Sequence, residues 1–173
     1  MKRLFLAATT AALLLAGSAV AQTVILVRHA EKVIEQNPDP ALTEAGQARA
    51  LVLSQVLADA GVTRVLSTPF VRTRETGRPT AEAAGLTVTE LSGGAVAPFV
   101  EAVRAGAPED VFLIVGHSNT VDRIAQALGD VHPETLTDCD YDRLWVLTLN
   151  GDQTRVVRGR YGAATAPCPS PAG

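Results

Sequence analysis

The sequence predicts an α/β fold, a three-layer α/β/α sandwich whose mostly parallel sheet ends in an antiparallel hairpin. Short apolar, β-branched runs at residues 24–27, 62–66 and 110–115 are typical of strands buried on both faces of a parallel sheet. Segments with helical spacing separate these runs, and alternation of strands and helices implies a sheet covered on both sides. Asn150-Gly151, between two further strand-like runs, is a strong signal for a β-hairpin.

Four helices are predicted between the strands. Thr43 has a side chain suited to an N-cap, and a run with helical spacing follows it until Gly61. Further helices are predicted at residues 71–84, 96–105 and 119–128, the first of which is interrupted by a glycine and a proline. The remaining predicted strands are residues 86–91, at a sheet edge, and the hairpin strands 144–149 and 154–160.

The first 21 residues have the three regions of a secretory signal. Lys2 and Arg3 supply positive charge, residues 4–16 are almost entirely apolar, and residues 19–21 fit the small-x-small cleavage pattern. The apolar run is shorter than the ~20 residues that span a bilayer, which favours cleavage over an uncleaved membrane anchor. We therefore expect residues 1–21 to be removed and the protein to be periplasmic or secreted, with no membrane anchor.

The remaining chain has the size of one domain. Its last segment, residues 163–173, is a Pro/Ala-rich tail. Loss of the leader removes two positive charges from a chain of net charge −3 and leaves Lys32 as the single lysine. Such an acidic protein has no general attraction for nucleic acid, so any phosphate must be held by a local cluster.

Two cysteines, Cys139 and Cys168, remain in the mature chain. An even number in an exported protein favours a disulfide between them, with two free thiols as the alternative. Two cysteines and three histidines without close spacing do not form a metal-binding pattern, and we predict no metal site.

Chemically distinctive residues follow three of the predicted strands. Arg28 and His29 follow the first, Arg72 lies shortly after the second, and His117 follows the third. Loops at the carboxyl ends of parallel strands meet at one edge, so these side chains should converge. Guanidinium groups match phosphate oxygens, and an imidazole can attack phosphorus. Asn119, at the start of the next helix, could contact the phosphate or simply cap the helix.

The three strand-end segments resemble the motifs of the histidine phosphatase superfamily, which has the phosphoglycerate-mutase-like fold. Their order and spacing are similar over residues 24–128, so we expect residues 22–162 to form one histidine phosphatase domain of the small single-domain branch. The similar segments are Arg28-His29-Ala30-Glu31, residues 67–76, and Val115-Gly116-His117-Ser118.

The resemblance implies a metal-independent phosphatase that needs no cofactor. It makes His29 the nucleophile that forms a phosphohistidine, with Arg28 and Arg72 holding the phosphoryl oxygens. His117 would donate a further hydrogen bond and stabilise the transferring group, as electrostatic stabilisation requires. The expected substrate is a phosphomonoester or a phosphohistidine, on a small molecule or on a phosphoprotein.

Hydrolysis of an ester also needs a proton donor for the leaving group. Many members of the superfamily supply a carboxylate between the second and third motifs, where Glu90 is the best-placed candidate. Glu31 and Asp39 are second choices. A phosphohistidine substrate could be hydrolysed without an acid, because protonated imidazole is a good leaving group.

Other functions are less consistent with the sequence. Ser118 follows His117 where phytase-like members have Asp, and the chain is short of the segments that enclose a mutase pocket. The sequence does not support a serine hydrolase, because residues 116–120 do not match the Gly-x-Ser-x-Gly motif. The main alternative is a non-catalytic phosphate-binding or anion-binding module of the same fold.

Overall fold

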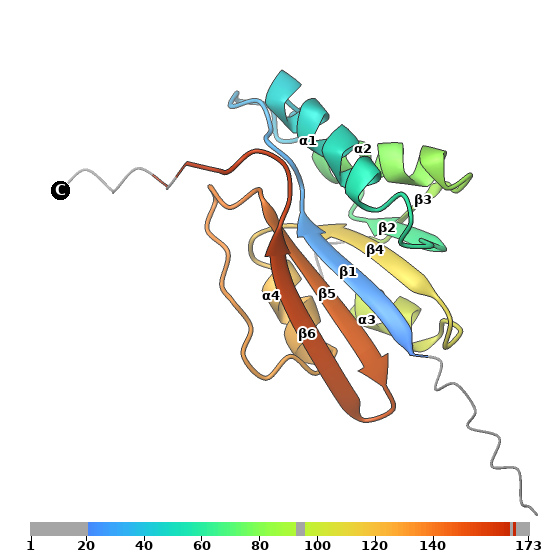
Figure 1. The fold of residues 1–173 in the computed structure, drawn as a ribbon. Helices are drawn as coiled ribbons and strands as arrows, with labels where there is room; N and C mark the ends of the chain where they lie inside the picture. Colours follow the sequence, from blue (N-terminus) through green and yellow to red (C-terminus); the bar gives the residue numbers. More distant parts are fainter. Residues whose placement is uncertain (1–20, 93–95, 167, 169–173) are drawn as a thin grey trace, which may run out of the picture.

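The computed structural model describes residues 21–92, 96–166 and 168 of the 173-residue chain. Apart from Ala21, the predicted secretory signal lies outside these residues. The described residues form a sheet of six strands in the order β3-β2-β4-β1-β5-β6, flanked by four helices (Figure 1). The elements in chain order are β1 (Gln22–Arg28), α1 (Glu44–Val56), β2 (Arg64–Ser67), α2 (Val71–Ala83), β3 (Val88–Glu90), α3 (Ala97–Arg104), β4 (Val111–Gly116), α4 (Val121–Ala127), β5 (Arg143–Asn150) and β6 (Gln153–Arg160).

The first four strands are parallel, and β5 and β6 form the predicted antiparallel hairpin beside β1. The predicted α/β class is confirmed. Asn150 pairs with Gln153, so the turn consists of Gly151 and Asp152, one residue later than the sequence signal suggested. Gly151 has a φ of 57°, which is the left-handed conformation that such tight hairpin turns require.

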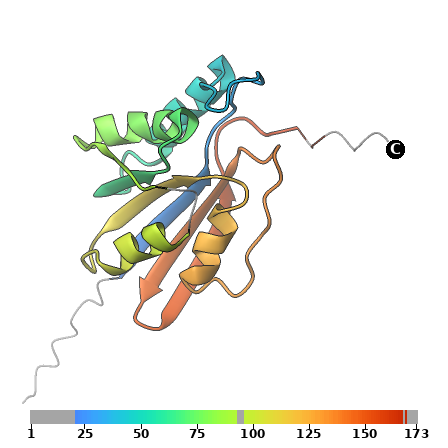
Figure 2. The same cartoon turned by 180° about the vertical axis from the view of Figure 1, so that it is seen from behind.

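Alternate residues of the central strands face two separate cores. Val24 and Leu26 of β1 point into a core shared with α3 and α4. Ile25 and Val27 point the other way, into a core shared with α1 and α2. Views from opposite sides show one helix pair on each face of the sheet (Figures 1 and 2). The predicted three layers follow from this alternation, because both faces of β1 and β4 are apolar.

The helix ends differ from the prediction by a few residues. Thr43 is the N-cap of α1, and its Oγ1 accepts a hydrogen bond from the N–H of Gly46, as predicted. Helix α1 ends at Val56, and turns continue the chain to Gly61. Helix α4 begins later than predicted, with Thr120 rather than Asn119 at its N-cap position.

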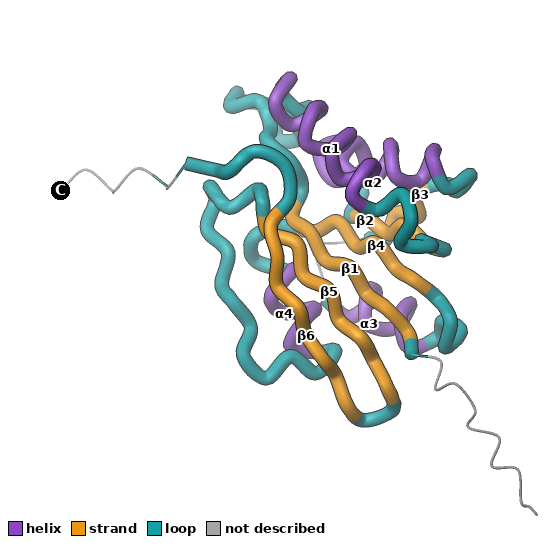
Figure 3. Tube along the Cα trace, in the orientation of Figure 1, coloured by secondary structure: helices purple, strands orange, loops and turns teal. Residues whose placement is uncertain are grey.

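The chain between α4 and β5, residues 128–142, forms a long loop without helix or strand (Figure 3). Connections this long inside a compact domain are uncommon, and many of them are functional. No helix in the described part of the chain combines the length and the apolar character needed to cross a membrane.

Candidate active site

A cavity of about 930 Å³ opens at the carboxyl edge of the parallel strands. Arg28 and His29 reach it from the end of β1, and His117 reaches it from the end of β4. Arg72 comes from the first turn of α2, which follows β2. The β1–β4 ladder pairs Arg28 with Gly116, so these two segments lie side by side. The structure thus gathers the two histidines and two arginines from their separate strand ends.

His29 is almost fully buried, with 3% of its surface exposed. Its Nδ1 lies 2.8 Å from the carbonyl oxygen of Ala30. Because a carbonyl oxygen only accepts hydrogen bonds, Nδ1 carries the proton of the neutral ring and Nε2 keeps its lone pair. The backbone N–H of His29 donates to the carbonyl oxygen of Gly116 at 2.9 Å. Backbone and ring are therefore both held, and Nε2 is the available nucleophilic atom.

Burial keeps both histidines of the cavity neutral. Burial above all, with electrostatic repulsion from Arg28, from the neighbouring His117 ring and from Arg72, lowers the pKa of His29 from 6.5 to about 3, although the hydrogen bond to Ala30 opposes this change. Burial, Arg72 and Arg28 likewise lower the pKa of His117 to about 4. At pH 7 both rings are uncharged in the free protein, and the neutral imidazole is the nucleophilic form.

A chain of hydroxyl groups orients His117. Its Nε2 lies 3.0 Å from Thr68 Oγ1, which in turn lies 2.7 Å from Thr73 Oγ1. The Thr73 hydroxyl donates to backbone carbonyl oxygens, at 2.8 Å from that of Phe70 and 2.9 Å from that of Thr68. Thr68 must then donate to Thr73, and its oxygen accepts the Nε2–H of His117. The network therefore assigns the Nε2–H tautomer to His117, the opposite of that in His29.

The glycine of the third motif allows a close approach of the chain to itself. The N–H of His117 donates to Thr120 Oγ1 at 2.9 Å. A Cβ atom at Gly116 would lie 2.9 Å from that same oxygen and 3.0 Å from a methyl group of Val121. A residue without Cβ is needed where the backbone turns this tightly into α4.

The two arginines present donors that lack acceptors. Arg28 Nη1 donates to the carbonyl oxygen of Thr137 at 2.8 Å, and its guanidinium lies 4.4 Å from the centre of the Tyr141 ring. The Arg72 guanidinium lies 4.3 Å from the centre of the Phe70 ring. Within the described residues, Arg28 Nε and Arg72 Nε and Nη1 are buried without a hydrogen-bond partner. Buried N–H groups normally have partners, and an oxyanion would supply oxygens of the kind that guanidinium groups bind.

Thr76 links the first two motifs. Its Oγ1 accepts a 2.9 Å hydrogen bond from the N–H of Ala30 and donates a 2.7 Å bond to the carbonyl oxygen of Arg72. Thr76 is fully buried. Since Ala30 orients the ring of His29, one hydroxyl couples the position of the nucleophile to that of the arginine.

The sequence match agrees with this geometry. Residues 24–93 match the family model of the histidine phosphatase superfamily (branch 1). The resemblance to the histidine phosphatase superfamily is confirmed. The matched segment contains Arg28, His29 and Arg72, whereas His117 lies beyond it and is placed by the fold. No curated protein matches the sequence.

Solved structures of several phosphatases share the fold. The protein histidine phosphatase SixA in complex with tungstate has a TM-score of 0.64 and 18% identity, over 80% of this chain and 96% of SixA. A structure from Agrobacterium tumefaciens assigned to the phosphohistidine phosphatase SixA has a TM-score of 0.56 and 23% identity, over 82% and 97%. Mycobacterial glucosyl-3-phosphoglycerate phosphatase in complex with inorganic phosphate has a TM-score of 0.62 and 16% identity, over 82% of this chain and 97% of that phosphatase. The chain thus has the fold of these phosphatases and spans 96–97% of their length.

Glu90, the predicted proton donor, is not among the described residues that line the cavity. It ends the edge strand β3, where it pairs with Ser67 in the ladder to β2. Its Oε2 lies 3.5 Å from Arg74 Nη1 at the start of α2, and the side chain is half-exposed. Glu90 therefore sits beside the site and faces a cation of its own.

The second-choice carboxylates also have partners. Glu31 receives hydrogen bonds from Arg49 Nε and Nη2 at 2.7–3.0 Å, and Arg49 is buried. Asp39 Oδ1 accepts the N–H of Val71 at 2.8 Å and lies 3.6 Å from Arg72 Nη1. Glu31 thus anchors Arg49, while Asp39 caps α2 and partly neutralises Arg72.

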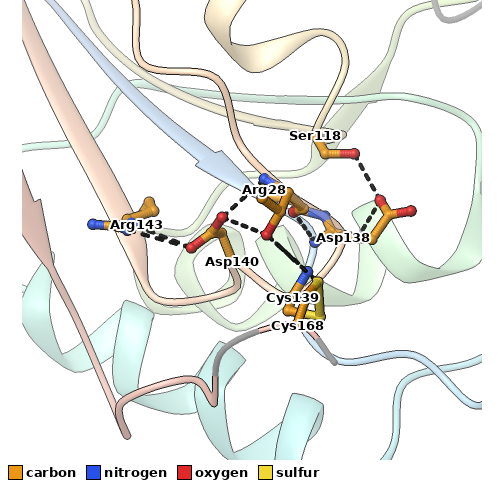
Figure 4. The surroundings of a disulfide bond; sticks show 8 residues. Arg28, Ser118, Asp138, Cys139, Asp140, Arg143 and Cys168 are labelled. Atoms are coloured by element: carbon orange, nitrogen blue, oxygen red, sulfur yellow. Dashed lines mark hydrogen bonds and ion pairs between the residues drawn. A yellow bond between two sulfur atoms is a disulfide. The ribbon is translucent and has the colours of Figure 1, made fainter. Parts of the chain in front are cut away.

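The loop before β5 supplies cavity residues that the sequence reasoning missed. Asp138 and Tyr141 of this loop line the cavity. Asn119, which the sequence analysis had named as a candidate, also lines it as an exposed residue of the turn after His117. Asp138 Oδ1 accepts a 2.9 Å hydrogen bond from Ser118 Oγ (Figure 4). The available signal was the long stretch of residues 129–142 with neither helix nor strand pattern, because loops of that length are often functional.

A disulfide joins this loop to the segment after β6. The structure pairs Cys139 with Cys168, whose Cα atoms are 5.2 Å apart (Figure 4). This is the pairing that the even cysteine count favoured. It fixes the residue next to Asp138, on the rim of the cavity.

Proposed function

We propose that this protein is an exported, metal-independent phosphatase that hydrolyses a phosphomonoester or a phosphohistidine through a phosphohistidine intermediate on His29. The observation that supports it best is the position of His29. This ring is buried and neutral, with Nδ1 bound to a carbonyl oxygen and Nε2 unprotonated, beside two arginines with buried, unpartnered donors.

The first step is attack by His29 Nε2 on the phosphorus atom. The bond from phosphorus to the leaving group breaks, its electron pair goes to the leaving atom, and the phosphoryl group is transferred to Nε2. Arg28 and Arg72 hold the phosphoryl oxygens, because guanidinium groups bind them through paired N–H donors. In the second step water attacks phosphorus, the P–N bond breaks, and phosphate and neutral His29 are released.

His117 stabilises the transferring group. Its Nε2–H is committed to Thr68, so the neutral ring offers no further donor to the cavity. The negative charge of a bound phosphate favours the protonated ring, which then donates from Nδ1. Donors aimed at developing charge are the main source of catalysis in phosphoryl transfer, so no metal ion is required by this mechanism.

The cavity accommodates more than a phosphate group. Its outer wall includes Ile34, Phe70 and Tyr141, which offer an apolar surface to the rest of the substrate. The similar structures carry the names of phosphatases for protein phosphohistidine and for glucosyl-3-phosphoglycerate. Export would separate this protein from cytoplasmic phosphorelays, so we favour a phosphomonoester.

The nucleophile is tested by trapping the intermediate. The mature protein, residues 22–173, is mixed with 4-nitrophenyl phosphate in the presence of a chelator and quenched within milliseconds. We expect turnover, and an acid-labile, base-stable phosphoenzyme. His29→Ala should abolish both. His132→Ala is the matched control, because His132 is exposed in the loop before β5.

Three outcomes would contradict the proposal. Retained turnover in His29→Ala would remove the nucleophile. Tight binding of inorganic phosphate without hydrolysis by the wild type at any pH would instead support the anion-binding module. Loss of turnover in the chelator alone would disprove metal independence.

Export is tested separately. The full chain and a chain lacking residues 1–21 are each expressed with a C-terminal tag in a Gram-negative host. We expect processed protein in the periplasm or medium only from the full chain. Equal retention of both chains in the cytoplasm would disprove export.

A further inference from the structure

Transfer of an ester phosphoryl group requires a proton for the departing oxygen, and Glu90 does not line the cavity. Asp138 is the only carboxylate among the described residues that form the cavity walls. It comes from the loop before β5, far in sequence from the segment in which the motifs lie. Its side chain is 87% exposed, so it projects toward the mouth of the cavity.

The contacts of Asp138 place its carboxylate between two elements of the site. Oδ1 accepts the 2.9 Å hydrogen bond from Ser118 Oγ and lies 3.4 Å from Arg28 Nη2 (Figure 4). Ser118 directly follows His117, and Arg28 directly precedes His29. One oxygen of the carboxylate therefore accepts hydrogen bonds from both catalytic segments. No described residue donates a hydrogen bond to Oδ2, which leaves that oxygen for a substrate or solvent.

The backbone around Asp138 is held on both sides. The carbonyl oxygen of Thr137 accepts the bond from Arg28, while the Thr137 N–H and hydroxyl donate to Asp140 Oδ2 at 2.8 Å and 2.6 Å. Cys139 is joined to Cys168. A carboxylate on a segment restrained in this way can be presented in a fixed direction, as proton transfer requires.

We propose that Asp138 is the catalytic acid and base for phosphomonoester substrates, an inference that rests on the proposed function. As His29 Nε2 attacks phosphorus, the P–O bond breaks and the protonated carboxyl group of Asp138 gives its proton to the departing oxygen, which leaves as an alcohol. The carboxylate then takes a proton from the water that attacks the phosphohistidine. The P–N bond breaks, and neutral His29 and the protonated acid are regenerated.

Substrate binding supports this role. Phosphate oxygens compete with Asp138 for the Arg28 guanidinium, so a bound phosphate brings the leaving group close to this carboxyl group. An acid at the mouth of the cavity also lies on the side from which the leaving group must depart.

The test compares Asp138→Asn with Glu90→Gln on two substrates. Glycerol phosphate has an alkoxide leaving group that needs a proton, whereas 4-nitrophenyl phosphate has one that is stable without it. Asparagine keeps an oxygen that can accept from Ser118 and Arg28, so the position of the loop is preserved. Asp152→Asn, in the exposed β5–β6 turn, is the matched control.

We expect Asp138→Asn to lower kcat about 100-fold or more on glycerol phosphate and less than about 5-fold on 4-nitrophenyl phosphate. The variant should still form the phosphoenzyme on His29 with the nitrophenyl ester, which shows that the proposed function is intact. Glu90→Gln and Asp152→Asn should remain close to wild type on both substrates.

Three results would overturn the inference without touching the nucleophile. Wild-type kcat on glycerol phosphate in Asp138→Asn would exclude an acid role. A rise in KM of equal size on both substrates would make Asp138 a positioning residue for Arg28. A selective loss on glycerol phosphate in Glu90→Gln would assign the acid to Glu90. If the wild type instead forms no phosphoenzyme with either substrate, it is the proposed function that fails.

Discussion

Arg28 Nη1 donates a 2.8 Å hydrogen bond to the carbonyl oxygen of Thr137, although the two residues are 109 positions apart in the chain. The same guanidinium lies over the Tyr141 ring. Both contacts come from the loop that the disulfide ties to Cys168. The orientation of a phosphate-binding arginine thus depends on a segment outside all three sequence motifs.

Loss of the disulfide should weaken substrate binding more than it slows the chemical step. In Cys139→Ser/Cys168→Ser we expect KM for 4-nitrophenyl phosphate to rise about 10-fold, which corresponds to one charged hydrogen bond. The kcat should change little, because His29 is held by Ala30 and Gly116. The free energy of unfolding, measured in urea, should fall by about 2–4 kcal/mol. Dithiothreitol should raise KM and lower the free energy of unfolding of the wild type, and should change neither in the double variant. An unchanged KM in the double variant would show that the disulfide does not support substrate binding.

Thr68 should set the tautomer of His117. Thr68→Val removes the acceptor for Nε2–H and leaves a ring of mixed tautomers, so we expect kcat to fall about 10-fold or more. Thr68→Ser keeps the hydroxyl and should restore most of the activity. Nitrogen-15 NMR of the His117 ring gives an independent measurement. If the spectrum of Thr68→Val still shows only the Nε2–H form, the hydroxyl chain does not control the ring.

Thr76→Val should reduce both stability and turnover. The substitution leaves the buried N–H of Ala30 without its acceptor, which costs about 1–3 kcal/mol. It also uncouples Ala30 from Arg72, so kcat should fall in the same variant. Thr76→Ser is the control that keeps the hydroxyl. Thermal unfolding and steady-state kinetics measure the two effects, and a stable but fully active valine variant would show that the link is unimportant.

Acid should destabilise the fold through the two histidines of the cavity. Their pKa values of about 3 for His29 and about 4 for His117 lie below the value of about 6.5 in an unfolded chain. Between these limits the unfolded state binds more protons, so the free energy of unfolding falls as the pH decreases from about 6.5. Each histidine adds at most about 1.4 kcal/mol per pH unit to this slope. Urea unfolding from pH 7 to pH 4 should show a shallower slope for His29→Gln and His117→Gln; equal slopes would contradict the burial effect.

The strands and the four central side chains could be predicted because they depend on short-range patterns. Apolar runs such as residues 111–116 can only be buried, and parallel strands bring the loops at their carboxyl ends to one edge. Helix ends were less predictable: Thr120 rather than Asn119 occupies the N-cap position of α4, and its Oγ1 accepts a hydrogen bond from the N–H of His117, outside the helix.

The outer wall of the site could not be predicted in this way. Tyr141 and Asp138 lie in a segment with no periodicity, and their position depends on contacts with Arg28 and Ser118 that are remote in sequence. The expected role of Glu90 assumed that a strand end faces the site. Its ion pair with Arg74, across the edge of the sheet, is a tertiary contact that the local pattern does not encode.

The direction of β5 has a consequence for how this fold can diversify. Because β5 runs antiparallel to β1, it begins at the edge where β1 ends, and Val27 pairs with Leu144. The loop before β5 therefore lies at the edge of the sheet that carries the active site. If β5 were parallel to β1, the preceding loop would lie at the opposite edge. Insertions or deletions in residues 128–142 would reshape the entrance and the surroundings of Arg28 and Asp138, while leaving the sheet register and the nucleophile His29 unchanged. Substrate preference could then diverge among relatives that keep one chemistry.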